Sequence, residues 1–378
     1  MEDYNEIKKL FRYFVIYGIS RTIIKVAGRT KFIFLKYFFI NLFIQKNRVI
    51  SLIGAGQFGF STISFYLQKN RGKVFLDCYD INAENMHFTS RFFNYNEVLS
   101  INSLFNNSNC KIVYIASNHS THMDYAISCI KNNLIVYIEK PLVVNYEQLI
   151  KFYQTIHLQK NYKIFLGFNR PFSPAILKLN HFLNKIEEPL SLNFFIIGHK
   201  ISENHWYHDP KEGTRICGNV AHWIDLMVNL MNTRGKIPNH YSINITFTSN
   251  TIYDDNFIIS INTDYKDIIS IFFTTRSEPF EGVNESINLQ CGSIMSKIDD
   301  FRTLQIWDQD YYHKNKYFYK NVGHEKAILQ PFSNHYSRNF LEIEISTIIM
   351  LEISEMIIKN ERTREFDAFV ILNKLKIA

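Results

Sequence analysis

The pattern of apolar and polar positions changes near the middle of the chain. In the first half, short apolar runs alternate with segments of helical spacing. The apolar runs lie at 49–53, 74–79, 111–116, 134–138 and 163–168, and the helical segments lie at 122–132 and 146–158. Strands that alternate with helices are typical of βαβ units and a parallel sheet. We therefore predict a doubly wound α/β domain that closes with the last of these runs.

In the second half, apolar runs with polar breaks follow one another closely. They lie at 190–198, 241–249, 257–264, 267–275 and 285–291, and helices are expected only at 172–182, 220–231 and 337–359. Consecutive strands favour an antiparallel or mixed sheet, and thus an α+β domain. The predicted boundaries are an arm at 1–47, a first domain at 48–168, a second at 169–359 and a tail at 360–378.

The predicted arm alternates basic with aromatic and aliphatic residues, which indicates short amphipathic helices. We expect it to pack on the body of the protein or on a second subunit. Peripheral contact with an anionic membrane is the alternative, because basic residues beside aromatic ones also suit an interface. The most apolar window, 32–43, is shorter than the roughly 20 residues that cross a bilayer, so no transmembrane segment is predicted.

Composition narrows the classes of function. The formal net charge is +7 over 378 residues, and outside the arm the basic residues are scattered, which gives nucleic-acid binding little support. The five cysteines include no Cys-x-x-Cys pair, so neither a disulfide framework nor a zinc site is indicated. The first residues lack the order of a secretory signal. These features together favour the cytoplasm.

The first candidate for chemistry follows the first predicted strand directly, as Gly54-Ala-Gly56-Gln-Phe-Gly59. In a dinucleotide-binding turn the first glycine makes the turn and the second lets the backbone approach a pyrophosphate. The third allows close packing of helix on strand. By itself the motif is weak evidence, since other α/β proteins also have glycine-rich turns.

An acidic residue strengthens this interpretation. Asp80 ends the second predicted strand, where a carboxylate can accept hydrogen bonds from the adenosine ribose. Residues 81–86 contain no Arg or Lys, which favours NAD over NADP, whose extra phosphate needs a cation. The alternative role for Asp80 is that of a turn or helix-cap residue.

A further candidate is Glu139-Lys140-Pro141, at the end of a predicted parallel strand. Ligands of such sheets collect at the carboxyl ends of the strands. A lysine at this edge can donate a hydrogen bond or a proton to a substrate oxygen. A surface lysine before a strand-ending proline is the alternative.

With these motifs the chain resembles the glucose-fructose oxidoreductase and inositol dehydrogenase (Gfo/Idh/MocA) family over roughly residues 48–359. The resemblance rests on the glycine motif, on Ala116-Ser-Asn-His-Ser-Thr-His122, on Glu139-Lys-Pro141, on Asn169-Arg170 and on His222-Trp-Ile-Asp225-Leu. It implies a Rossmann domain with a parallel sheet, followed by an α+β domain with a large, mostly antiparallel sheet that covers the nicotinamide.

The resemblance also implies roles for individual residues. Lys140 would touch the reacting hydroxyl and His222 would be the general acid/base, with Asp225 one helical turn later. The imidazole suits this task, because alcohol oxidation needs a base for the hydroxyl proton and an unperturbed imidazole has a pKa of about 6.5. The residues implied at the cofactor are Gly54, Gly56, Gln57, Phe58, Gly59, Asp80, Ser117, Asn118, His119, His122, Glu139, Lys140, Asn169 and Arg170.

One departure from the family pattern concerns the acid near His222. Many members carry an Asp four residues before this histidine, where this chain has Gly218 followed by Asn219. Asp209, Glu212 and Asp225 are the candidates to replace it. The remaining residues expected at the substrate are Trp206, as a stacking platform, and Asp209, Arg215 and Asn219. A metal is not expected, because His205 and His208 lack a convincing ligand pattern.

These observations predict an NAD-dependent oxidoreductase acting on a secondary alcohol of a sugar, a sugar nucleotide or a related polyol. The resemblance places it in surface-polysaccharide sugar metabolism. The alternatives are a carbonyl or imine reductase of the same fold and an inactive cofactor-binding regulator. We expect a homo-oligomer, either a dimer or a tetramer.

Overall fold

The computed structural model describes residues 2–39, 45–159, 161–202, 204–247, 255–277, 282–333 and 338–377. The last residues of the strand predicted at 241–249 and the first of the helix predicted at 337–359 lie outside these ranges. The chain divides into two compact units. The parallel-sheet unit comprises Tyr17–Gly167 and His324–Ser337, and the mixed-sheet unit comprises Met1–Ile16, Phe168–Gly323 and Arg338–Ala378.

The parallel-sheet unit is built on six strands in the order β3-β2-β1-β4-β5-β6, in which all neighbouring pairs are parallel. The strands are β1 (Gln45–Ile53), β2 (Lys73–Tyr79), β3 (Asn96–Glu97), β4 (Ile112–Ile115), β5 (Ile135–Ile138) and β6 (Ile164–Leu166). This is the strand order of a Rossmann fold, whose order reverses between β1 and β4. The predicted parallel sheet is confirmed.

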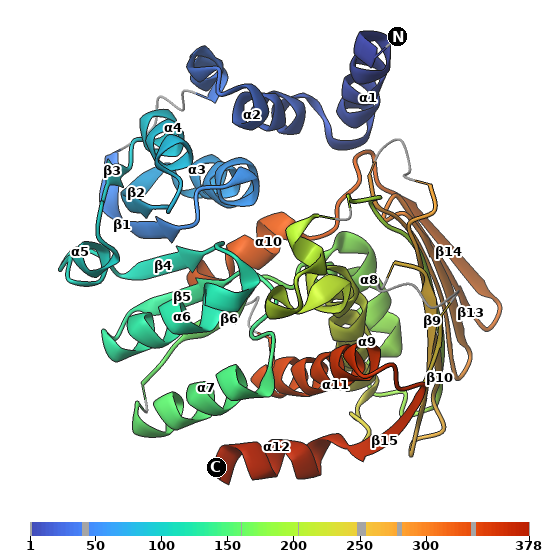
Figure 1. Cartoon of the computed structure of the whole chain (residues 1–378). Helices are drawn as coiled ribbons and strands as arrows, with labels where there is room; N and C mark the ends of the chain where they lie inside the picture. Colours follow the sequence, from blue (N-terminus) through green and yellow to red (C-terminus); the bar gives the residue numbers. More distant parts are fainter. Residues whose placement is uncertain are drawn as a thin grey trace. The chain divides into compact units, whose positions relative to one another are not determined.

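Helices connect these strands (Figure 1). They are the π-helix η2 (Gly59–Ser64), α3 (Phe65–Arg71), α4 (Ala83–Phe93), α5 (Ile101–Phe105), the 3-10 helix η3 (His119–Thr121), α6 (His122–Lys131) and α7 (Tyr146–Leu158). Asparagine side chains cap two of them: Asn82 accepts from the backbone N–H of Asn85 and Asn145 from that of Gln148, each at 2.9 Å. Such caps satisfy backbone donors that the first turn leaves unpaired.

A late segment of the chain completes this unit. It contains α10 (His324–Ile328) and the 3-10 helix η8 (Gln330–Phe332). Ile328 is fully buried in the unit's hydrophobic core. Its carbonyl accepts from the Tyr114 hydroxyl at 2.7 Å, and the Gln330 side chain donates to the Leu166 carbonyl at 2.9 Å. The unit is therefore discontinuous in sequence.

The N-terminal region forms α1 (Glu2–Tyr17), α2 (Ile19–Thr30) and the 3-10 helix η1 (Ile33–Phe39), as its amphipathic pattern indicates. Ile24 and Ala27 of α2 lie in the core of the parallel-sheet unit. This half of the predicted arm is thus part of that unit, because its apolar face is buried there. Among the described residues, no helix is both long and apolar enough to span a bilayer.

The mixed-sheet unit contains nine strands in the order β14-β13-β12-β11-β7-β10-β9-β8-β15. They are β7 (Leu190–Ile197), β8 (His240–Phe247), β9 (Phe257–Thr263), β10 (Ile268–Thr274), β11 (Asn284–Cys291), β12 (Ile294–Asp299), β13 (Thr303–Asp308), β14 (Tyr311–Lys316) and β15 (Thr363–Asp367). The pair β7 and β10 is parallel and the others are antiparallel. The predicted large, mostly antiparallel sheet is confirmed.

Side chains along these strands alternate between buried and exposed, as in a sheet covered on one face. Helices α8 (Pro174–Leu183), α9 (Ala221–Arg234) and α11 (Phe340–Ile358) lie on one side of the curved sheet in Figure 1. Helix α11 is buried along most of its length. The region predicted as a tail contains β15 and α12 (Ala368–Ile377), and β15 pairs with β8.

Candidate active site

The glycine-rich turn leaves the carboxyl end of β1. Gly54 has φ +92°, and a Cβ there would lie 2.4 Å from the backbone of Ala116. A Cβ at Gly59 would lie 2.1 Å from the carbonyl oxygen of Gly54, whereas at Gly56 no atom lies within 4 Å. Gly54 and Gly59 are therefore required by the fold, and Gly56 leaves the backbone open to a ligand. This arrangement fits the pyrophosphate of a dinucleotide.

Asp80 is joined to this turn. Its Oδ2 accepts from the backbone N–H of Ala55 at 2.6 Å, and its Oδ1 accepts from that of Asn82 at 2.7 Å. The carboxylate therefore lies between the ends of β1 and β2 and fixes the turn. Carboxylate oxygens have further acceptor capacity, so this position also suits the predicted contact with an adenosine ribose.

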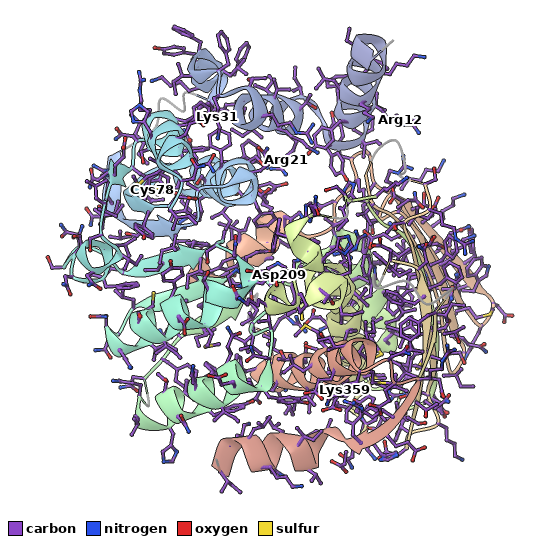
Figure 2. The ribbon with its side chains drawn as sticks, viewed as in Figure 1. Arg12, Arg21, Lys31, Cys78, Asp209 and Lys359 are labelled. Atoms are coloured by element: carbon purple, nitrogen blue, oxygen red, sulfur yellow. The ribbon has the colours of Figure 1, made fainter. Side chains whose placement is uncertain are left out.

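A cation from outside the predicted motifs lies beside this loop. Lys31 follows the last residue of α2 (Figure 2). Its Nζ donates to the Asn85 side chain at 2.6 Å. Burial lowers the pKa of Lys31, while the Glu84 and Asp80 carboxylates raise it. Sequence reasoning missed this residue because it considered only the cations of residues 81–86.

The segment 116–122 follows β4. Ser117 and Asn118 are accessible, while His119 and His122 are buried. The two ring nitrogens of His122 lie 2.9 Å from the Pro141 carbonyl and 3.0 Å from the Ser117 carbonyl. His122 thus connects the loops that follow β4 and β5, which favours a positioning role over a direct contact with cofactor.

Glu139 and Lys140 are buried at the carboxyl end of β5, and the following Lys140–Pro141 bond is cis. Glu139 Oε2 has no hydrogen-bond partner among the described residues. Gly167 makes room for it, because a Cβ there would lie 2.2 Å from this oxygen. Burial raises the pKa of Glu139 to about 8, against the opposing charge of Lys140. A buried acceptor without a partner suits a ribose hydroxyl.

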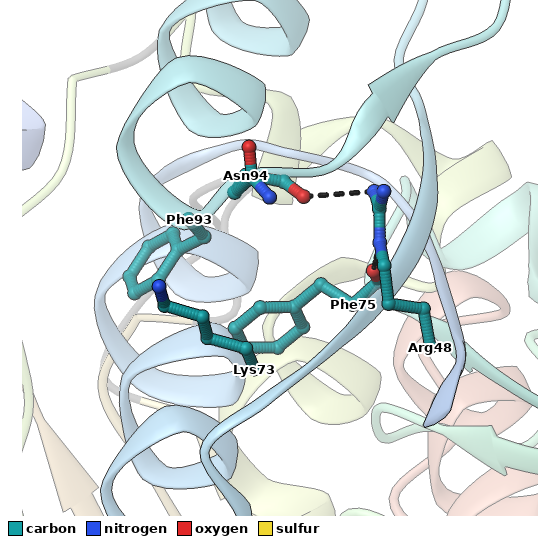
Figure 3. A pocket seen from close by; sticks show the side chains of 5 residues that line it. All are labelled: Arg48, Lys73, Phe75, Phe93 and Asn94. Atoms are coloured by element: carbon teal, nitrogen blue, oxygen red, sulfur yellow. Dashed lines mark hydrogen bonds between the residues drawn. The ribbon is translucent and has the colours of Figure 1, made fainter. Parts of the chain in front are cut away.

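A small pocket lies at the opposite ends of β1 and β2 (Figure 3). It is lined by Arg48, Lys73, Phe75, Phe93 and Asn94, and the Arg48 guanidinium donates to the Asn94 carbonyl at 2.9 Å. Ligands of parallel sheets bind at the carboxyl ends of the strands. This pocket is therefore not the candidate cofactor site.

In the mixed-sheet unit, His222 is the second residue of α9 and follows the π-helix η7 (Ile216–Val220). Its ring is 6.1 Å from that of Phe168 and 6.2 Å from that of Trp223. The side chain is partly exposed. A π-helical turn is frequent at functional sites, and it sets the position of His222 relative to Gly218.

The structure gives a physical reason for glycine at position 218. A Cβ there would lie 2.9 to 3.2 Å from atoms of the Tyr207 ring. Tyr207 belongs to the 3-10 helix η5 (Trp206–His208), and its ring is 4.3 Å from that of Trp206. The space that a side chain at position 218 would need is thus filled by an aromatic ring. Sequence reasoning did not single out Tyr207.

Asp225 faces a different partner. Both of its oxygens accept from the Arg338 guanidinium at 2.8 Å, and Arg338 also contacts Glu342 of α11. Burial raises the pKa of Asp225 to about 6, and Arg338 opposes that rise. A carboxylate held in this way joins α9 to α11, which favours a structural role over the predicted catalytic one.

Two predicted arginines lie in buried networks. Arg170 makes two hydrogen bonds to Glu285, at 2.7 and 3.1 Å, and Trp223 donates to the same carboxylate at 2.8 Å. Arg215 donates to the His199 carbonyl at 2.9 Å and lies 3.4 Å from Asp255. These arginines hold the helices of this unit on its sheet, so direct contact with a ligand stays a prediction.

The other predicted residues differ in exposure. Asn169 donates to the Val322 carbonyl at 2.6 Å, and its Oδ1 is buried without a partner among the described residues. Asn219 Oδ1 is also buried without a hydrogen-bond partner among the described residues.

Trp206 and Asp209 are exposed. Asp209 (Figure 2) caps the 3-10 helix η6 (Pro210–Glu212), because its side chain accepts from Lys211 N–H at 2.9 Å. Glu212 is buried. The described residues contain no cluster of metal ligands.

Comparisons with known proteins agree with the geometry. Residues 49–168 match the model of the Gfo/Idh/MocA family, described as an oxidoreductase family with an NAD-binding Rossmann fold. No curated protein matches the chain.

Several solved structures share the fold of the chain. Levoglucosan dehydrogenase in complex with NADH and L-sorbose is 15% identical with a TM-score of 0.69, covering 85% of this chain and 99% of its own. A dehydrogenase (MviM) from Clostridium difficile is 18% identical with a TM-score of 0.65, covering 83% of this chain and 100% of its own. Residues 49–168 thus match the NAD-binding Rossmann domain of the Gfo/Idh/MocA oxidoreductase family.

Proposed function

We propose that this chain is an NAD-dependent oxidoreductase that interconverts a secondary alcohol and a ketone on a sugar, a sugar nucleotide or a polyol. The observation that carries the proposal is the buried, unpartnered Oε2 of Glu139. Glu139 follows β5 at the carboxyl end of the parallel sheet, where dinucleotides bind. The open backbone of Gly56 follows β1 at the same end of this sheet. Levoglucosan dehydrogenase, one of the similar structures, is named for a sugar substrate.

Each residue of the proposed machinery has a chemical task. The backbone at Gly56 binds the pyrophosphate, Asp80 accepts from the adenosine ribose, and Glu139 accepts from the nicotinamide ribose. Bound NAD supplies the carbon that accepts or returns a hydride.

At the substrate, Lys140 donates a hydrogen bond to the reacting oxygen, and His222 takes the hydroxyl proton during oxidation. In the reverse direction His222 returns this proton. The hydrogen bond from Lys140 and the proton transfer to or from His222 therefore prevent a full negative charge on the substrate oxygen.

Cofactor binding is tested first, by titrating NADH and following its fluorescence. Gly56→Ala should retain the wild-type melting temperature, because its Cβ meets no atom within 4 Å. It should weaken NADH binding by about tenfold or more, because the methyl group occupies the approach of the pyrophosphate. Unchanged binding would contradict the proposed cofactor site.

Turnover is then measured with a panel of sugars, sugar nucleotides and polyols, by the absorbance of NADH. Lys140→Ala and His222→Asn should each lower kcat by about 10²- to 10⁴-fold, the usual effect of losing a general acid or base. NADH binding without turnover of any substrate would favour a regulator that binds the cofactor.

A further inference from the structure

The junction between α2 and η1 brings Lys31 to the adenosine end of the candidate cofactor site. Helix α2 is fixed on the parallel-sheet unit by Ile24 and Ala27 in the core. Lys31 follows the helix with a left-handed backbone, φ 55°. Its Nζ lies 2.6 Å from Asn85 Oδ1 and 5.1 Å from the centre of the Phe88 ring. Both contacts are to α4, so the cation is held between the end of α2 and the first turns of α4.

A chain of hydrogen bonds connects this cation with the predicted ribose ligand. Asn85 donates its backbone N–H to the Asn82 side chain at 2.9 Å, and Asn82 donates its own backbone N–H to Asp80 Oδ1 at 2.7 Å. Asp80 Oδ2 in turn accepts from Ala55 in the glycine-rich turn at 2.6 Å. Lys31 therefore contacts the first turn of α4, directly after the loop that contains Asp80.

The charges of the side chains at this loop decide whether it accepts the free ribose hydroxyl of NAD or the 2′-phosphate of NADP. A carboxylate at the end of β2 suits the free ribose hydroxyl of NAD and repels the 2′-phosphate of NADP. The phosphate adds a charge of about −2 and needs a lysine or arginine nearby. Residues 81–86 provide none, and Lys31 is contributed by a segment about 50 residues earlier in the chain.

We propose that Lys31 is a cofactor-specificity residue that lets this site accept the 2′-phosphate of NADP in addition to the ribose hydroxyl of NAD. The inference rests on the proposed cofactor-binding function. In the phosphate-bound state Lys31 exchanges its hydrogen bond to Asn85 for one to a phosphate oxygen. In the NAD-bound state it keeps that bond and does not touch the cofactor.

The test compares the binding of NADH and NADPH to the full chain by fluorescence titration. Wild-type protein should bind both, and Lys31→Met should weaken NADPH binding by about tenfold or more, since a charge-assisted hydrogen bond is lost. Its NADH affinity should stay within about twofold of wild type. Lys31→Arg, which retains the charge, should bind NADPH to within a few-fold of wild type.

Lys36→Met is the matched control, because Lys36 is also in this N-terminal segment and its ammonium group lies 5.5 Å from the centre of the Tyr37 ring. It should change neither affinity. Raising the ionic strength should weaken NADPH binding more than NADH binding in wild type, and this difference should shrink in Lys31→Met.

The outcomes separate this inference from the proposed function. NADH binding without measurable NADPH binding by wild type overturns the role of Lys31 and leaves the proposed function standing. Equal weakening of both cofactors in Lys31→Met shows that Lys31 only tethers the N-terminal segment, and also overturns it. If neither cofactor binds, the proposed function fails together with the inference.

Discussion

Gly218 shows how a residue that departs from a family pattern can be explained by its surroundings. The ring of Tyr207 occupies the space that a side chain at 218 would need. Glycine here and tyrosine at 207 are therefore coupled, although eleven positions separate them in the sequence. An acid at position 218 therefore requires the Tyr207 ring to move or to be replaced.

Substituting Gly218 tests this coupling. Gly218→Asp should lower the free energy of unfolding by about 1–3 kcal/mol, the usual effect of overpacking a well-filled site. The double variant Tyr207→Ala with Gly218→Asp should lose less than the two single variants together, because truncation of the ring removes the collision. Urea denaturation measures all four proteins. Additive losses in the double variant would show that the two residues are not coupled.

Residues could be predicted from sequence where their role depends on neighbours along the chain. The glycine motif and Glu139-Lys140 follow strands directly, so their place at the sheet edge follows from the strand pattern alone. Lys31 and Tyr207 could not be found in this way, because their importance comes from contacts with distant segments. The absence of any Asp or Glu between Ile7 and Leu76 was the available sign of an unusual basic segment.

At the scale of elements, α9 and α11 are joined by a buried ion pair between Asp225 and Arg338. The Asp225 side chain is completely buried, and Arg338 lies next to the N-terminus of α11. Helix α11 is apolar around most of its circumference, so this pair and Glu342 fix its orientation beside α9. Removing either partner leaves a charge in an environment that cannot solvate it.

Arg338→Met should lower the free energy of unfolding by about 3–5 kcal/mol at neutral pH. Burial already raises the pKa of Asp225 to about 6 from 3.8, and loss of Arg338 raises it further. A raised acid pKa stabilises the protein only at low pH, and this stabilisation is lost as the pH rises through the folded-state value. The defect should therefore be larger above pH 6 than near pH 4, as measured by denaturation across this range.

Lys359→Ala is the control for this prediction. Lys359 pairs with Glu355 at the exposed C-terminal end of α11 (Figure 2). Exposed pairs at this spacing contribute about 0.3–0.5 kcal/mol. A loss in Lys359→Ala as large as that in Arg338→Met would contradict the argument from burial.

At the scale of the whole molecule, sequence reasoning identified the parallel sheet and most strands of the mixed sheet. The sequences of those strands contain apolar runs long enough to predict a buried strand. It missed β12, β13, β14 and β15, and β14 is largely exposed, so it lacks the apolar run of a buried strand. It also missed the return of residues 324–332 to the parallel-sheet unit, because no local pattern specifies which core a short helix joins.

This return can be tested with two isoleucines that are close in sequence and buried in different units. Ile328 lies in the core of the parallel-sheet unit, and Ile348 lies in α11 of the mixed-sheet unit. Both side chains are fully buried, so each Ile→Ala substitution should lower the stability of its own unit by about 2–5 kcal/mol. Native-state hydrogen exchange reports stability segment by segment.

Ile328→Ala should accelerate exchange in β1 and β4 more than in β7 and β10, although the substituted residue is much closer in sequence to the mixed-sheet unit. Ile348→Ala should show the opposite order. The physical reason is that the exchange of an amide depends on the free energy of opening of its own cooperative unit, and each cavity lowers that free energy for the unit that contains it. Faster exchange in β7 and β10 on Ile328→Ala, with β1 and β4 unchanged, would mean that residues 324–332 stabilise the mixed-sheet unit instead.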